Sequence, residues 1–487
     1  MTEAAGEDGQ VARKIDFDLL RQELSDEIVE GPLERYHLNW PGKREAMLAA
    51  NAPIAKTLRP CREESVDFDT TQNLFIEGDN LEALKLLQET YLGKVKMIYI
   101  DPPYNTGSDF IYDDDFAEEA WAYFSRSLQK DESGNNLVAN SESNGRFHSD
   151  WLSMLFARVK IAKTFLKDDG FLVVSIDDDE LQTTRQFLDE LFGRQNAIAV
   201  LVWDKNRKND ARFFSVGHEY MLVYAKSKQH LLDSGEKLRE PKPGIDDAKR
   251  LFQRLKRSHG DDWEEIQTAW REHYRGLPDS DESKPLGRFS KVGPRGPYRD
   301  DGDISWPGGN GPKYDVLHPV TGKLCKKPRG GWVYPTIDRF NEAVSTGRVV
   351  FGEDETTLPR QTRYLFESEG QVMRSVFYSY AQTATVEFVQ LMGERVFDNP
   401  KNWRDLQRII SYLTDPDDII FDFFAGSAST AHAVMEQNVL DEGNRRWILV
   451  QLAESVDEES VAASEGYQTI DGISRERIRR VADRIRS

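Results

Sequence analysis

The chain has 487 residues, 39% of them hydrophobic and 30% charged, so it can bury a large core in about two to three domains. Its formal charge of −20 excludes indiscriminate DNA coating but not a DNA enzyme, since binding depends on where positive charge lies. Cys61 and Cys325 form neither a CxxC pair nor an even framework, so we expect reduced thiols and no metal. The acidic N-terminus and short apolar runs indicate a cytoplasmic protein without a membrane partner.

Strands alternate with helices in the first half of the chain. Residues 1–70 form an N-terminal arm, in which apolar spacing predicts a helix over 15–29. Strands are predicted at 74–76, 95–100, 170–176, 198–203 and 218–225, and helices at 81–91, 151–166 and 181–192. This alternation is typical of a doubly wound, mostly parallel α/β sheet. The long polar segment 106–147 is typical of a functional loop.

The pattern changes between residues 226 and 394, which are rich in glycine and proline and are typical of an inserted module. The α/β signal then returns, with a strand, tight turn and helix start at 419–430 and a strand at 448–451. We therefore divide the chain into an arm (1–70), two halves of one α/β domain (71–225 and 395–487) and the inserted module (226–394).

The strand over 95–100 runs directly into Asp101-Pro-Pro-Tyr104. In a parallel sheet, ligands bind where strands end, so Asp101 is expected in the ligand crevice. The two prolines cannot continue a ladder or helix, and we expect their carbonyls to be unpaired. A carboxylate, free carbonyls and a flat ring suit an exocyclic amine on a planar base.

A second motif, Phe421-Asp-Phe-Phe-Ala-Gly426, ends a strand in small residues and opens a helix near Ser427. Free N–H groups at a helix N-terminus favour a carboxylate or phosphate. Taken alone the pattern is weak, because an ordinary βα turn looks the same.

Together these motifs resemble a known family. Asp101-Pro-Pro-Tyr104 resembles the catalytic motif of amino-group DNA methyltransferases, which methylate adenine N6 or cytosine N4. The runs 76–84 and 101–116 resemble the modification (Mod) subunit of type III restriction–modification systems, and the similarity extends from about residue 33 to the end. The catalytic strand precedes the cofactor strand, as in the permuted β group of these enzymes. The resemblance implies a methyltransferase fold that binds S-adenosylmethionine, with target recognition in 226–394.

The resemblance also implies the site residues. Asp101 and the carbonyl of Pro102 would accept hydrogen bonds from the amine of a flipped-out adenine, and Pro103 and Tyr104 complete the catalytic motif, with Tyr104 stacking on the base. The residues implied for cofactor binding are Asp79, Asn80, Phe397, Asn399, Lys401, Asp422, Phe424, Gly426, Ser427, Thr430 and Gln451.

Three of these assignments carry alternatives. Asp79 would accept from the cofactor adenine, but its spacing fits a helix N-cap equally well. Lys401 would pair with the cofactor carboxylate, or be ordinary surface charge. Gln451 stands where this fold often places an acid for ribose hydroxyls. The family also has a second glycine where this chain has Ala428, which would add strain if φ is positive and crowd the cofactor if it is not.

For DNA contact we expect Lys323, Lys326, Lys327 and Arg329. A second basic cluster lies at 205–208 with Arg212, and either cluster alone fits solvated surface charge. The implied partners are double-stranded DNA, a homodimer mate and a restriction (Res) subunit. Members of the family continue well beyond the position of Ser487, so dimer or Res contacts are expected to be affected.

Other functions stay open at this point. The same motif permits cytosine-N4 methylation, and Ala428 keeps open a catalytically impaired DNA-binding relative. A C5-cytosine enzyme would need a nucleophilic cysteine, for which Pro60-Cys61 is a poor candidate among charged residues. A nicotinamide oxidoreductase lacks its GxGxxG motif here.

Overall fold

The protein is represented by a computed structural model that describes residues 2–5, 11–14, 38–106, 110–112, 137–139, 147–205, 212–367 and 370–486. The helix expected over 15–29 lies outside these residues, as do most of the 106–147 loop and of the 205–208 cluster. No helix within the described ranges is long and apolar enough to cross a membrane.

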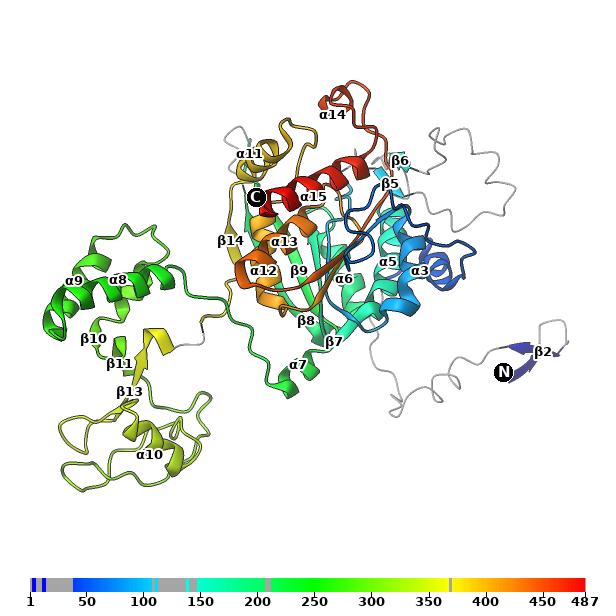
Figure 1. Cartoon of the computed structure of the whole chain (residues 1–487). Coiled ribbons are helices and arrows are strands. Elements are labelled where there is room, and N and C mark those ends of the chain that lie inside the picture. The colour runs from blue at the N-terminus through cyan, green and yellow to red at the C-terminus, as the bar shows by residue number, and fades with distance from the viewer. Residues whose placement is uncertain are drawn as a thin grey trace.

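An eight-stranded sheet forms the centre of the molecule (Figure 1). All neighbouring pairs are parallel except those made by β9. In spatial order the strands are β14 (Val376–Tyr378), β8 (Ala197–Asp204), β9 (His218–Ala225), β7 (Leu166–Ile176), β4 (Val95–Ile100), β15 (Ile419–Asp422), β16 (Arg446–Gln451) and β3 (Leu74–Glu77). The predicted doubly wound, mostly parallel sheet is confirmed.

Two hydrophobic cores cover the two faces of this sheet, since successive strand residues point to opposite sides. In β4, Ile98 and Ile100 enter one core and Met97 and Tyr99 the other. The first core is closed by α3 (Asn80–Tyr91), α5 (Phe147–Phe165) and α6 (Leu181–Phe192), with α2 (Lys43–Asn51) packed on α5. The second is closed by α12 (Trp403–Leu413) and α13 (Ser429–Asp441).

The C-terminal helix α15 (Ile470–Arg486) packs against α13 and against α11 (Ala381–Met392), and α14 (Val461–Ser464) precedes it. Smaller strand pairs are β1 (Thr2–Ala5) with β2 (Val11–Lys14) and β5 (Phe110–Tyr112) with β6 (Leu137–Ala139). These elements lie outside the central sheet.

The order of the strands creates a switch point between β4 and β15. From β4 the chain proceeds through α5 to β7 on one side, and from β15 it proceeds through α13 to β16 on the other. Ligands of open α/β sheets bind in the crevice where the order reverses, outside the carboxyl ends of the strands. Asp101 follows β4 and Phe423 follows β15, so the two sequence motifs flank this crevice.

The inserted region leaves the sheet after α7 (Lys228–Ser234) and forms two small lobes beside it (Figure 1). One lobe holds α8 (Ile245–His259), α9 (Trp263–Gly276) and the antiparallel sheet of β10 (Lys291–Gly293), β11 (Gly296–Gly302), β13 (Arg360–Tyr364) and β12 (Val349–Val350). The other surrounds α10 (Ile337–Ser345), around buried Trp332 and Phe340. The predicted range 226–394 is too long, because β14 within it pairs with β8 in the central sheet.

Candidate active site and cofactor turn

The segment after β4 is held by contacts from α5 and α6. Asn105 has a φ of 62°, a left-handed conformation that asparagine tolerates, and its amide donates to the buried Glu180 carboxylate at 2.7 Å. Trp151 Nε1 donates to the Pro103 carbonyl at 2.7 Å, so the expectation that both proline carbonyls are unpaired was wrong for Pro103. Within the described part of the chain, no group donates a hydrogen bond to the Pro102 carbonyl. Of the two, only the Pro102 carbonyl is free for a ligand.

Lys401 connects the catalytic motif to two other segments. Its ammonium lies 3.1 Å from Asp101 Oδ1 and 2.6 Å from Glu219 Oε2, and it donates to the Tyr104 hydroxyl at 2.5 Å. It also lies 4.7 Å from the centre of the Tyr104 ring. Lys205 donates to the same Glu219 oxygen. Two ammonium groups and two carboxylates therefore balance at the end of β4.

The pKa values of these groups reflect this charge balance. Burial would raise the pKa of Glu219, but Lys401 and Lys205 together lower it to about 2. Burial, with Lys401 nearby, lowers the pKa of Lys205 to about 8. For Lys401 burial is outweighed by Asp101 and Glu219, which raise its pKa. At neutral pH Glu219 is therefore ionised between the charged Lys205 and Lys401.

The turn after β15 is tied to its own helix. The buried Asp422 carboxylate accepts the Phe424 N–H at 3.0 Å through one oxygen and the Thr430 hydroxyl at 2.6 Å through the other. Burial raises the pKa of Asp422 to about 7. Asp422 and Thr430 therefore bind each other, and they can act on a cofactor only by fixing the shape of the turn.

Gln451, at the end of β16, supports the same turn. Its Oε1 accepts the Gly426 N–H at 2.7 Å and its Nε2 donates to the Leu452 carbonyl at 3.3 Å. Both ends of the amide are used, which leaves little of it for ribose hydroxyls. Gly426 has a φ of 51°, and a Cβ built on it would lie 3.8 Å from the Phe397 ring, so Phe397 borders the turn.

Ala428 lies at the N-cap of α13 with φ 60° and ψ 36°, the left-handed region. Alanine there is strained by roughly 1–2 kcal/mol. Its side chain is fully buried and packs in the second core, below the turn. Of the two effects expected for this position, strain is therefore found, and the methyl group packs away from the crevice.

Asp79 is the N-cap of α3, since its Oδ1 accepts the Glu82 N–H at 2.9 Å. Its other oxygen accepts from Arg158 Nη2 at 3.1 Å. The buried Asn80 donates to the Phe423 carbonyl at 2.8 Å and accepts from Arg158 Nε. The helix-cap alternative for Asp79 is thus present in the structure, and Asn80 joins the ends of β3 and β15.

The remaining predicted residues differ in environment. Ser427 is buried and bonded to Arg477, which donates to its hydroxyl at 2.9 Å and to its carbonyl at 3.1 Å. Phe424 is buried beside Phe423. Asn399 is exposed. The Lys401 ammonium pairs with Asp101 and Glu219, while its backbone carbonyl accepts from the Ser429 hydroxyl at 3.0 Å, at the start of α13.

Two carboxylates of the site were missed by sequence reasoning. Glu219 is the second residue of β9, and only the fold shows that it meets Lys401. Glu454 follows β16 by three residues, and burial alone raises its pKa. No ion pair or hydrogen bond to its side chain occurs among the described residues. Its position close behind the strand that ends at Gln451 is the signal that could have identified it.

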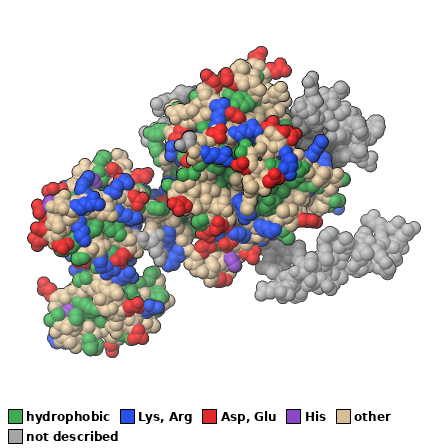
Figure 2. All heavy atoms as spheres, in the orientation of Figure 1, with side chains coloured by type: hydrophobic (Ala, Val, Ile, Leu, Met, Phe, Trp, Pro, Cys, Tyr) green, Lys and Arg blue, Asp and Glu red, His purple; other side chains and the backbone are tan. Residues whose placement is uncertain are grey.

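The predicted DNA contacts lie in the α10 lobe and are only partly free. Lys323 pairs with Glu355 at 3.1 Å and Lys327 with Asp315 at 2.5 Å. Lys326 and Arg329 are exposed, and no described carboxylate pairs with either. Figure 2 shows Lys and Arg side chains gathered on the other lobe, over α8 and α9. The exposed cations of α8 are Lys249, Arg250, Arg254, Lys256 and Arg257.

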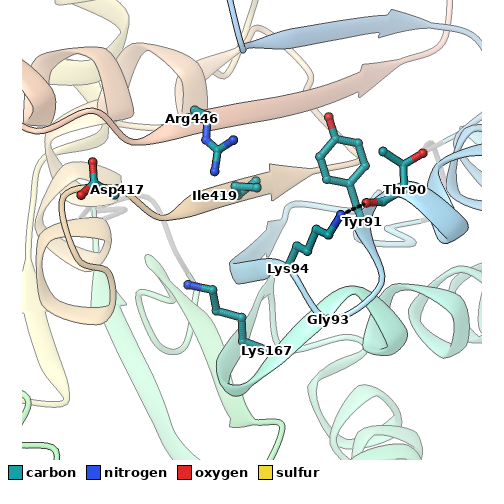
Figure 3. Close-up of a pocket in the computed structure, with 8 residues that line it drawn as sticks. All are labelled: Thr90, Tyr91, Gly93, Lys94, Lys167, Asp417, Ile419 and Arg446. Atoms are coloured by element: carbon teal, nitrogen blue, oxygen red, sulfur yellow. Dashed lines mark hydrogen bonds between the residues drawn. The ribbon is translucent and has the colours of Figure 1, made fainter.

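A cavity of about 370 Å³ lies at the opposite, amino edge of the sheet (Figure 3). It is lined by residues at the starts of the strands or just before them, among them Lys94, Lys167 and Arg446. Lys94 donates to the Thr90 carbonyl at 2.7 Å. This cavity is separated from Asp101 by the length of the strands, so it is not the site that the motifs define.

Known proteins resemble this chain over most of its length. Residues 95–456 match the family model described as DNA methylase. The chain is 35% identical to the Mod subunit of the type III restriction-modification enzyme EcoP15I of Escherichia coli, covering 94% of this chain and 71% of that protein. It is 34% identical to the StyLTI Mod subunit of Salmonella typhimurium, covering 99% and 68%.

The chain belongs to the type III Mod family of DNA methylases. The predicted family and its DNA-methylating activity are thereby confirmed, and the chain is a DNA methyltransferase. The type II methyltransferase M.KpnI of Klebsiella pneumoniae is also similar, with 30% identity over 85% of this chain and 89% of that protein.

The strain at Ala428 generates a prediction for the Mod chain. Ala428→Gly removes the left-handed strain but also a buried methyl group worth about 0.8 kcal/mol, so overall stability changes little. We expect S-adenosylmethionine, measured by calorimetry, to bind the variant as tightly as the wild type or up to about threefold tighter. Tightening by tenfold or more would show that the methyl group crowds the cofactor, and absence of binding in both proteins would contradict the cofactor assignment.

Proposed function

We propose that this Mod chain transfers a methyl group from S-adenosylmethionine to adenine N6 in double-stranded DNA at a defined sequence. The observation that carries the proposal is the placement of Asp101-Pro-Pro-Tyr104 beside the glycine turn of β15, at the switch point of the sheet. The Mod relatives favour adenine, whereas the motif itself also suits cytosine N4. Residues 226–375 would select the sequence.

The crevice residues fit a nucleoside with an amino-acid tail. Glu454 offers an unpaired, half-buried carboxylate at the end of β16, suited to two ribose hydroxyls. The turn 423–428 supplies a fixed backbone shape, because the N–H groups of Phe424, Ala425, Gly426 and Ala428 are bonded within the protein, and Phe397 borders Gly426. The remaining lone pairs of Asp79 face the same strand ends. We assign the cofactor to these groups, with Gln451, Asp422 and Thr430 holding the turn.

When bound, S-adenosylmethionine supplies an electrophilic methyl group on sulfur. Asp101 and the free Pro102 carbonyl accept the two N–H groups of the target amine, which favours a pyramidal nitrogen with an available lone pair. Positive charge that develops on the nitrogen is stabilised by the Asp101 carboxylate. The nitrogen–carbon bond forms as the sulfur–carbon bond breaks, and the proton leaves to solvent afterwards.

Lys401 prepares Asp101 for this role. It neutralises the carboxylate before the target arrives, and Glu219 holds the same ammonium at 2.6 Å. When the target amine donates its hydrogen bond to Asp101, Lys401 therefore keeps Glu219 as a partner and is not left as an unpaired buried charge. Tyr104 is fixed through its hydroxyl, 3.0 Å from Glu219, and we assign its ring to stacking on a flipped base.

Two alternatives lose support from the geometry. Cys61 is exposed in a segment without helix or strand, which does not suit a C5-cytosine nucleophile. An impaired DNA-binding relative is disfavoured by the intact, charge-balanced set around Asp101. Cytosine-N4 methylation stays the alternative function.

The biological setting follows from the family. The type III relatives are Mod subunits of restriction-modification enzymes. We propose that this chain acts in the cytoplasm, forms a homodimer and associates with a Res subunit. Co-purification with a Res protein of the same cell would test the association.

Asp101→Ala tests the reaction. The variant should lose at least about a hundredfold in methyl transfer, because the amine loses its charged acceptor, while the Kd for S-adenosylmethionine changes less than about threefold. Transfer is measured with labelled cofactor, and sequencing that reports modified bases identifies the target. The exposed Asp179→Ala at the same edge is the control. Full activity of Asp101→Ala would remove this residue from the mechanism, and modified cytosine would overturn the adenine assignment.

Glu454→Gln tests the cofactor assignment. Since an uncharged amide accepts more weakly from two hydroxyls, the Kd for S-adenosylmethionine should rise roughly tenfold, with kcat at saturating cofactor nearly unchanged. Glu442→Gln, at the far end of α13, is the matched control. An unchanged Kd for Glu454→Gln would place the ribose elsewhere.

Neutral variants of the exposed cations test DNA binding. Lys326→Gln with Arg329→Gln should weaken binding to all DNA and reduce the salt slope by about 0.9 for each phosphate that the protein no longer neutralises. Lys323 and Lys327 should contribute less, since each already has a carboxylate partner. Matching substitutions on α8, at Arg254 and Arg257, show which lobe binds phosphate more strongly. An unchanged slope for the Lys326 and Arg329 pair would remove that cluster from the DNA path.

A further inference from the structure

Exposed aromatic side chains gather at one edge of the molecule. In the described part of the chain, the exposed large aromatic residues are Phe213, Phe214, Tyr378 and Tyr380. Phe213 and Phe214 precede β9, and the two tyrosines end and follow β14. Because β8 and β14 are parallel to β4, all four lie at the carboxyl edge, where Asp101 lies. We call these four residues the aromatic edge.

The phenylalanines are the most exposed of the four, at 85% and 87%. Scattered exposed apolar residues are ordinary on protein surfaces, but two adjacent phenylalanine rings left in water are not explained by packing within the chain. A ring of this size gains free energy only when another apolar or stacking surface covers it. The rings therefore point to a partner.

The loop that carries them is anchored in the catalytic charge network. Its base is closed by the Lys205 N–H, which donates to the Gly217 carbonyl at 2.8 Å. Lys205 and Glu219, one on each side of this base, are the residues that hold Lys401 and Tyr104. Phe214 precedes Glu219 by five residues, a reach of at most about 17 Å. The rings can thus reach the DNA that surrounds a base bound at Tyr104.

The two tyrosines lie beside the same loop. Ser379 N–H donates to the Asp204 carbonyl at 3.0 Å, so Tyr378 and Tyr380 lie beside the start of the loop. Their rings meet edge to face at 5.2 Å. Arg212 adjoins Phe213, 5.5 Å from its ring, and supplies positive charge for phosphate. Stacking rings beside a cation are the chemistry of contacts to nucleic-acid bases.

We propose that the aromatic edge binds the duplex around the target nucleotide, and that Phe213 and Phe214 insert into the base stack at the position that the flipped base vacates. Extrusion of a base leaves a gap in the stack, and an apolar ring that fills it lowers the cost of the flipped state. Phe213 and Phe214 are positioning residues that act on DNA outside the reacting atoms. The inference rests on the proposed methylation of duplex DNA.

The test compares a paired target with one that is already mispaired. Once sequencing has located the target base, methylation is measured on a duplex with the normal partner and on one with a mismatch at that position. Phe213→Ala with Phe214→Ala should lower kcat/KM on the paired duplex at least about tenfold, and on the mispaired duplex less than about threefold, because the mismatch already lowers the flipping cost. Leu440→Ala, an exposed apolar residue at the end of α13, is the control.

Equal losses on both duplexes, or no loss on either, would overturn the proposal. A second measurement needs no methyl transfer: the double variant should bind DNA more weakly with an unchanged salt slope, whereas Arg212→Gln should reduce the slope by about 0.9. If the double variant binds DNA as tightly as the wild type, the proposed insertion of Phe213 and Phe214 is overturned, whether or not the wild type methylates DNA. A wild type that methylates no DNA would refute the proposed function separately. If the double variant and the wild type differ in sedimentation when no DNA is present, the proposal is overturned and the aromatic edge is assigned to self-association instead.

Discussion

The ion network around Lys401 is the interaction on which the active site depends. The Lys401 ammonium joins the end of β4, the start of β9 and the segment before α12. These three segments are distant from one another in the sequence. The partners of Lys401, Asp101 and Glu219, are themselves partly buried, and two carboxylates in such a place would repel each other without the two lysines. Removing Lys401 would take away the ammonium that Asp101 and Glu219 share, so the end of β4 and the start of β9 are fixed by the same contact.

A second layer of contacts holds the turn after β15 against the ends of β3 and β16. Asn80 bonds the Phe423 carbonyl across from β3, and Gln451 bonds the Gly426 N–H from β16. Both side-chain amides therefore connect the ends of different strands by hydrogen bonds. This arrangement explains how Ala428 can occupy a left-handed conformation: the buried surroundings of the turn stabilise a backbone shape that alanine alone disfavours.

The roles proposed toward DNA for the site, the inserted lobes and the aromatic edge are separate. The lobes are built around small cores of their own, and their exposed cations lie on helices and loops that face away from those cores. Phosphate contacts of this kind set position, whereas base contacts and flipping require groups at the crevice. The residues of the aromatic edge precede and follow the lobes in sequence, and they lie at the carboxyl edge of the sheet, as the catalytic motif does.

The sequence by itself determined the sheet, the catalytic motif and the family, since strand and helix periods are local and Asp101-Pro-Pro-Tyr104 is contiguous. It did not determine which groups meet. The neighbours of Lys401, the full use of the Gln451 amide and the free carboxylate of Glu454 arise from strands that are distant in sequence and adjacent in the sheet. Likewise, β14 was assigned to the inserted module because three residues carry no clear period, and only pairing with β8 placed it. Long-range pairing decides such contacts, and a local pattern does not contain it.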